Sequence, residues 1–269
     1  MKNDSPLHPY GQKRIGRINV QGIWTLYLKE VMRFFKVFMQ TIMAPTITTF
    51  LFMTVFTVAL GRDRYVGELS FQMFLAPGLI MMAIVQNAFA NTSSSMMAAK
   101  MQGNITDILL APLGPTEIIL GFALGGITRG LLVGSFIGLT MLMFVDLAIH
   151  HVWAVLYYSI AASLLLSLMG ILTGVWAEKF DQSAGINNFI IVPLSFLSGT
   201  FYSIHALPGI WYSLSQLNPF FYVIDGFRYG LTGQSDAPLL TGVILLGILN
   251  IALWLCCYYI LKSGYKLRT

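Results

Sequence analysis

Long apolar runs alternate with short polar stretches along the whole chain. A helix needs about 20 mostly apolar residues to cross the hydrocarbon core of a membrane. Six runs reach or approach this length, so the sequence predicts six membrane-spanning helices. Their expected ranges are 34–60, 71–93, 118–145, 152–177, 183–201 and 239–261. We expect an all-α integral membrane protein with one domain over 34–261, an N-terminal segment over 1–36 and a tail at 262–269.

The segment before the first run has helical periodicity. Apolar residues recur at spacings of three and four between Val20 and Phe35, whereas Lys29, Arg33 and Lys36 fall on another face. The pattern is typical of an amphipathic helix that lies on the inner membrane surface, with its basic face toward lipid headgroups. The alternative is that this helix extends the first span into the cytosol.

Composition supports a membrane protein and orients it. Apolar residues make up 56% of the 269 residues and charged residues only 10%, whereas soluble domains carry about 25% charged residues. The net charge of +5 does not indicate a nucleic-acid partner here, because Lys and Arg mark the cytoplasmic side of membrane proteins. Seven of the 16 basic residues lie in the first 36 positions, and three more lie in the C-terminal tail. Both termini are therefore expected in the cytoplasm, which requires an even number of spans.

An even count leaves the segment 202–236 without a crossing. Its stretch SLSQLNPFFYVIDGFRYGLTGQ is apolar but contains Asn218-Pro219, Asp225 and Arg228. We expect re-entrant helices on the outer side, broken at Asn218-Pro219 because proline disfavours helix at the residue before it. Asp225 and Arg228, at i and i+3, are placed to pair. The pair is either a clip that holds a re-entrant hairpin or a charged part of an outer gate.

Polar side chains inside the expected spans have two interpretations. They either line an inward-facing cavity or hydrogen-bond neighbouring helices, and the arginine could also reach back to the headgroups. The residues concerned are Gln86, Asn87, Asn91, Arg129, Asn187 and Asn188. A separate stripe of small residues predicts close helix packing. It consists of Gly126, Gly130, Gly134 and Gly138.

Catalytic and cofactor motifs are absent from the sequence. It has no G-x-x-x-x-G-K-[ST] phosphate loop and no G-x-G-x-x-G. The pair His150-His151 lacks the spacing of a helical metal site. We therefore expect no metal, no cofactor and no enzymatic activity in this chain.

The stretch 100–117 is the one substantial loop expected on the inner side. Ile105, Ile108 and Leu109 would form one face of a short helix that ends before Pro112. That face either receives a docking partner or packs against the ends of the neighbouring spans.

In four places the chain resembles the permease subunits of type-2 ABC exporters. They are the amphipathic helix, the run GNITDILLAPL at 103–113, the run LSGTFYSIHALP at 197–208, and Leu217-Asn218-Pro219 with Tyr222 and Arg228. The four occur in order on a six-span frame and cover almost the whole chain. The run departs from the family's commoner threonine-leucine-glutamate type at 104–106, which affects the expected fit to a particular ATPase.

The resemblance implies a half-transporter in the bacterial cytoplasmic (inner) membrane. Two permease chains, expected as a homodimer, would each meet a separately encoded ATP-binding subunit that binds ATP and Mg. The coupling helix seated on that subunit would comprise Gly103, Asn104, Ile105, Asp107, Ile108, Leu109 and Pro112. A second inner contact would comprise Glu178, Lys179 and Asp181. The outer gate or re-entrant element would comprise Asn218, Pro219, Tyr222, Asp225 and Arg228.

The resemblance leaves the substrate open. The family moves polysaccharides on lipid carriers, lipids, drugs and antibiotics. No appended carbohydrate-binding domain is evident, and the polarity inside the spans is modest, so a lipid-like, amphipathic or hydrophobic substrate is favoured over a polysaccharide or lipid-linked glycan. A stand-alone secondary transporter is an alternative of a different class. Inverted repeats or a ladder of buried carboxylates would support it, and neither is evident in the sequence.

Overall fold

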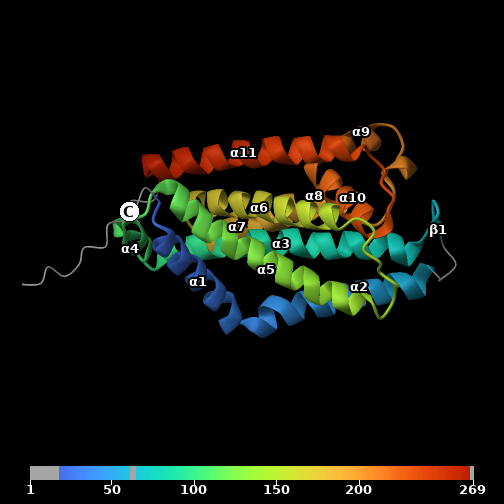
Figure 1. Ribbon diagram of the computed structural model, residues 1–269, viewed down its shortest axis with the longest axis horizontal. Helices are drawn as coiled ribbons and strands as arrows, with labels where there is room; N and C mark the ends of the chain where they lie inside the picture. The colour runs from blue at the N-terminus through green and yellow to red at the C-terminus, as the bar shows by residue number, and fades with distance from the viewer. Residues whose placement is uncertain (1–17, 61–64, 267–269) are drawn as a thin grey trace, which may run out of the picture.

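A computed structural model of the chain describes residues 18–60 and 65–266. The part of the predicted N-terminal tail at 1–17 and the end of the C-terminal tail at 267–269 lie outside the described residues. Long helices run side by side and form an elongated bundle (Figure 1). The helices and strands are α1 (Val20–Lys36), η1 (Met39–Met43), α2 (Ala44–Leu60), β1 (Tyr65–Val66), β2 (Leu69–Ser70), α3 (Phe71–Met101), α4 (Ile105–Leu110), α5 (Pro115–Met141), α6 (Val152–Trp176), α7 (Phe180–Ile186), η2 (Asn187–Ile191), α8 (Val192–Phe196), η3 (Ile204–Ala206), α9 (Ile210–Leu217), α10 (Pro219–Thr232) and α11 (Leu239–Ser263).

Five helices among the described residues are long and apolar enough to cross a membrane. They are Met39–Ala59, α3, α5, α6 and α11. Strands are confined, in the described part of the chain, to the antiparallel two-residue pair β1 and β2. The architecture is that of an all-α membrane protein.

The fifth expected span is not one of these five helices. In its place, 180–196 is helical but consists of α7, the π-helical turn η2 and α8. A π-helical turn widens the helix locally and shifts the side chains that follow it. The count of six spans therefore stays a prediction.

Two other expected boundaries differ from the structure. α3 continues to Met101, eight residues past the expected end at Ser93. Ser93 and Ser95 are buried inside the bundle, so the polarity of this stretch does not end the helix. α5 begins at Pro115, ahead of the expected start at residue 118, because Glu117 accepts a hydrogen bond from the backbone N–H of Gly114 (2.6 Å) and caps the first turn.

α3 is the central helix of the bundle. In its most apolar stretch 72% of the residues are buried inside the protein, against 11% for α11. Glycines allow the close approach of its neighbours. A Cβ on Gly130 of α5 would lie 2.9 Å from the carbonyl oxygen of Ile84, and one on Gly170 of α6 would lie 2.7 Å from the carbonyl oxygen of Phe89. The backbone of α3 is therefore closely approached by α5 on one side and by α6 on another.

The glycines of the predicted stripe differ in the space around them. A Cβ on Gly126 or Gly134 would also be too close to its neighbours, at 2.2 and 2.4 Å. At Gly138 the nearest atom to an added Cβ would be the end of the Ile80 side chain, at 3.9 Å. Two glycines that the stripe omits face α1 instead: a Cβ on Gly121 would meet Leu26 at 2.6 Å and one on Gly125 would meet Glu30 at 2.5 Å. α5 therefore has two small-residue faces.

The two ends of the described chain lie at the same end of the bundle, beside α4 (Figure 1). Asn19, before α1, donates a side-chain hydrogen bond to the carbonyl oxygen of Pro112 (3.0 Å). Lys266, after α11, forms an ion pair with Glu178 (2.8 Å). α9 and the β1–β2 hairpin lie at the opposite end.

Candidate functional site

α4 is a short helix between the ends of α3 and α5. Gly103, just before it, has φ +75°, a conformation that favours glycine. Ile105 and Ile108 are buried and join an apolar cluster that includes residues of α1, α5 and α6. Leu109 and Leu110 are exposed, the latter to 79%. One face of α4 therefore packs against the bundle, and another is open to a partner. The sequence pattern predicts Leu109 on the same face as Ile105 and Ile108, but Leu109 is exposed and the two isoleucines are buried.

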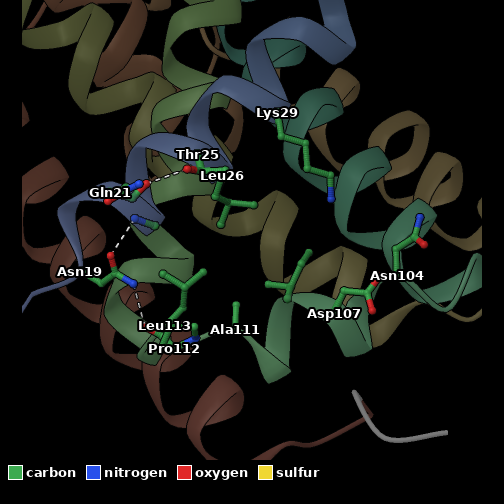
Figure 2. A pocket seen from close by; sticks show the side chains of 12 residues that line it. Asn19, Gln21, Thr25, Leu26, Lys29, Asn104, Asp107, Ala111, Pro112 and Leu113 are labelled. Carbon is green, nitrogen blue, oxygen red and sulfur yellow. Dashed lines mark hydrogen bonds between the residues drawn. The ribbon is translucent and has the colours of Figure 1, made fainter. Parts of the chain in front are cut away.

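A groove of about 650 Å³ separates α1 from α4 (Figure 2). Lys29 extends from α1 on one side, and Asp107 and Asn104 lie on the other. Leu26 and Leu113 contribute apolar surface. The groove therefore combines an apolar surface with charged side chains, next to the exposed leucines of α4.

The side chains of Asn19 and Glu117 hold this groove together. Asn19 accepts from the backbone N–H of Gly22 (2.8 Å) and so caps α1, while its amide donates to Pro112. Glu117 accepts from the backbone N–H groups of both Asn19 and Gly114. One carboxylate thus connects the start of α1, the exit of α4 and the start of α5.

The second expected inner contact lies at the same end of the bundle. Glu178, Lys179 and Asp181 are all exposed. Glu178 pairs with Lys266, and this hydrogen bond lowers the pKa of the Glu178 carboxyl and raises the pKa of the Lys266 ammonium group. Lys100 of α3 donates to the carbonyl oxygens of Val175 and Ala177 (2.5 and 2.9 Å) and so caps the end of α6.

A buried ionic cluster joins α1 to α3, and sequence reasoning missed its acidic member. The carboxylate of Glu30 is fully buried and accepts from Ser95 (2.6 Å) and from Arg33 (3.2 Å). Arg33 also donates to the side chain and the backbone carbonyl of Asn91, both at 2.8 Å. Arg33 therefore points inward rather than lying wholly on the expected basic face. The available signal was the position of Glu30 midway between Leu26 and Phe34, on the buried face of α1.

Arg129 has fewer hydrogen-bond partners than Arg33. Its guanidinium donates one hydrogen bond, to the side-chain oxygen of Asn87 (3.1 Å), and its buried Nε has no partner. Among the described residues no carboxylate pairs with it. Asn87 in turn donates to the carbonyl oxygen of Ala83 (3.0 Å).

The polar residues expected in a cavity do not form one group. Gln86 and Asn87 line a cavity of about 220 Å³ together with Thr48 and Thr49 of α2. Asn91 belongs to the ionic cluster with Arg33. Asn187 and Asn188 bond each other (3.1 Å) in η2, and neither lines that cavity.

Asn218 and Pro219 begin α10, and Asp225 and Arg228 lie buried within it. Asn218 caps the helix by accepting from Phe220 (3.0 Å) and donates to the carbonyl oxygen of Leu194 (2.7 Å). Tyr222, half-buried, packs edge-on against Phe221 (ring centroids 5.0 Å apart). α10 is thereby tied to the end of α8.

Asp225 and Arg228 are both buried and well supplied with partners. Their charged groups are 3.8 Å apart. Arg228 donates to the carbonyl oxygens of Gly199 (2.7 Å) and Phe74 (3.3 Å) and lies 3.8 Å above the Phe74 ring. The Asp225 carboxylate accepts from the backbone N–H groups of residues 236 and 237 (2.8 and 3.1 Å). The pair thus connects α10 with α3, with the turn after α8 and with the loop before α11.

No group of three His, Cys, Asp or Glu side chains is placed to hold a metal ion in the part of the chain that the structure describes.

The sequence is similar to those of known proteins over most of its length. The ABC-2 type transporter family matches residues 21–232. The inner membrane transport permease YadH of Escherichia coli K12 is 38% identical over 255 residues, which cover 94% of this chain and 98% of that protein. YadH of Shigella flexneri matches to the same extent. Nodulation protein J of Rhizobium leguminosarum bv. viciae is 26% identical over 200 residues, 72% of this chain and 73% of that protein. The chain therefore belongs to the ABC-2 type transporter family.

Proposed function

We propose that this chain is the permease subunit of an ATP-driven exporter in the bacterial inner membrane. Two copies form the path for the substrate, and each meets a separate subunit that binds ATP and Mg and hydrolyses the nucleotide. Membership of the ABC-2 type transporter family and similarity to an inner membrane transport permease support the proposal. The chain itself is not an enzyme in this assignment.

The observation that carries the proposal is the exposed apolar face of α4. Leu109 and Leu110 leave 38% and 79% of their surface exposed in the single chain, whereas Ile105 and Ile108 of the same helix are buried in the bundle. Such a helix receives a partner on one side and passes its movement to the bundle on the other. The groove between α1 and α4, with Lys29 and Asp107 beside it, offers the partner a second surface.

The proposed membrane arrangement has six crossings with both termini in the cytoplasm. The helical run 180–196 provides the sixth crossing, and α9 and α10 are re-entrant on the outer side. Asn19 contacts Pro112 after α4, and Lys266 contacts Glu178 after α6. Both ends of the described chain lie at the same end of the bundle, which supports an even count (Figure 1).

In the proposed mechanism, ATP binding closes the two ATP-binding subunits against each other, and this movement displaces α4. Differential binding of nucleotide to inward-open and outward-open states shifts their populations. Displacement of α4 would be transmitted to α1 and α5 through Asn19 and Glu117. We favour an amphipathic substrate, because the cavity of about 220 Å³ beside α2 is lined by Gln86 and Asn87 together with apolar side chains.

The test uses the chain co-purified with its proposed ATP-binding subunit. Leu110→Ala should weaken the complex about tenfold or more, because burying a leucine at an interface contributes about 1.5–3 kcal/mol. Leu217→Ala is the matched control, since Leu217 is equally exposed, at 79%, but lies in α9 at the other end of the bundle. Affinity is measured by titration in detergent and coupling by ATPase activity. An unchanged affinity for Leu110→Ala, or ATPase activity of the chain alone, would contradict the proposal.

A further inference from the structure

The region where α1 ends and α2 begins contains more positive than negative charge. Arg129 of α5 lies one helical turn beyond Gly125, the residue against which Glu30 packs. Arg33 donates to Asn91, which lies one helical turn along α3 from Asn87, the partner of Arg129. The carboxylate in this cluster is that of Glu30, and it forms its ion pair with Arg33. One positive charge is therefore left without a counter-charge among the described residues.

An unmatched cation is costly where water is scarce. Arg228 indicates how this chain satisfies a buried guanidinium: two carbonyl oxygens, an aspartate and an aromatic ring. Arg129 has a neutral amide and an unpartnered Nε. The difference indicates that a group outside the chain supplies the missing negative charge.

A hollow of about 550 Å³ on α1 provides access to this cluster. Arg33 lines it with the exposed third of its side chain, flanked by Lys29 and Lys36. Leu28 and Met32 form its apolar part. Arg33 thus links the hollow to Asn91 of α3, one helical turn from Asn87, the residue that Arg129 contacts. Cations beside an apolar surface match an anionic headgroup carried on a hydrophobic tail.

We propose that this region, formed by Lys29, Arg33, Lys36 and Arg129, binds the anionic headgroup of an amphiphile, with the partly buried Arg129 as the charge that selects for it. The headgroup carries phosphate or carboxylate. It belongs either to a resident membrane lipid or to the transported molecule, and only the second source rests on the proposed function.

The first experiment needs only the purified full-length chain, so it does not depend on the ATP-binding subunit. The chain is placed in nanodiscs of phosphatidylcholine with increasing phosphatidylglycerol, and retained lipid is counted by native mass spectrometry. Arg129→Gln should lower the preference for phosphatidylglycerol about tenfold, since a charge in a medium of effective dielectric about 20 still acts over several ångströms. Arg129→Lys keeps the charge and should keep most of the preference.

Lys262→Gln is the control, because Lys262 is an exposed cation on α11, away from α1. It should leave the preference unchanged. Thermal unfolding establishes that each variant is folded, and Arg129→Gln is expected to pass because glutamine can still donate to Asn87. Equal retention of the two lipids by the unmodified chain, or an unchanged preference in Arg129→Gln, would overturn the proposal.

A second arm identifies the source of the headgroup. In the reconstituted complex, phosphatidylglycerol that stimulates ATPase activity in an Arg129-dependent way is transported cargo. Binding without stimulation identifies a resident lipid. Either result supports the headgroup site, whereas loss of coupling in Leu110→Ala with intact lipid preference would concern only the proposed function.

Discussion

At the scale of single residues, the chain buries guanidinium groups in different environments. Arg228 has an acidic partner, two carbonyl oxygens and an aromatic ring, whereas Arg129 has one amide. A charge held as tightly as Arg228 stabilises a local arrangement, because moving it would break several interactions at once. The contacts of Arg228 and Asp225 therefore favour a structural clip over a mobile gate.

Arg228→Ala should destabilise the protein by about 3–5 kcal/mol, because it leaves the Asp225 carboxylate buried without its cation. Arg129→Ala, which removes a single hydrogen bond to a neutral amide, should cost about 1 kcal/mol. Thermal unfolding of both variants in the same detergent compares them. If Arg228→Ala unfolded like the unmodified chain and bound its ATP-binding subunit, yet failed in export, Arg228 would be part of a gate.

At the scale of helices, glycine positions determine where backbones touch. α5 presents Gly126, Gly130 and Gly134 toward α3 and α6, and Gly121 and Gly125 toward α1. The contact loosens by Gly138, where only the tip of Ile80 comes within 4 Å. The close contact is therefore confined to the part of α5 nearer α4.

Gly130→Val should lower stability by about 2–3 kcal/mol or prevent folding, because its Cβ would lie 2.9 Å from the backbone oxygen of Ile84, which cannot rotate away. Gly138→Val, in the same helix, should cost less than about 1 kcal/mol, because its Cβ would have nearly open space. Thermal unfolding and the yield of monodisperse protein measure both variants. Equal losses would mean that valine disturbs α5 itself rather than its packing.

At the scale of the whole molecule, the described chain begins and finishes beside α4, while the hairpin β1–β2 and the loop after α10 lie at the other end (Figure 1). Gln234, in that loop, bonds Glu68 of the hairpin (2.9 Å). Different segments of the chain therefore lie at the two ends of the bundle. If the bundle crosses the membrane, its two ends face different compartments.

Impermeant maleimide labelling of intact cells tests the orientation, in a chain carrying Cys256→Ser and Cys257→Ser. Ser235→Cys should react, since residue 235 is exposed after α10, whereas Leu110→Cys and Lys262→Cys should react only after the cells are opened. Reaction of Leu110→Cys in intact cells would reverse the proposed orientation. Opposite behaviour of Leu110→Cys and Lys262→Cys would exclude an even number of crossings.

The sequence alone predicts the class of protein, the five long apolar helices, the short helix α4 and the break at Asn218-Pro219. These depend on local composition and on backbone restrictions within a few residues, which an apolar run or a proline reveals directly. The family resemblance was also contained in the sequence, and the matched range confirms it.

The pairing of polar groups from different helices follows from the folded structure. Glu30 accepts a hydrogen bond from Ser95, 65 residues away, and Arg33 donates one to Asn91, 58 residues away. Arg228 donates to the carbonyl oxygen of Phe74, 154 residues away. Periodicity assigns such residues to a face but does not identify the helix opposite that face. Whether a charge within the bundle has many partners, as Arg228 does, or one neutral partner, as Arg129 does, depends on that opposite helix, because burial removes water that would otherwise solvate the charge.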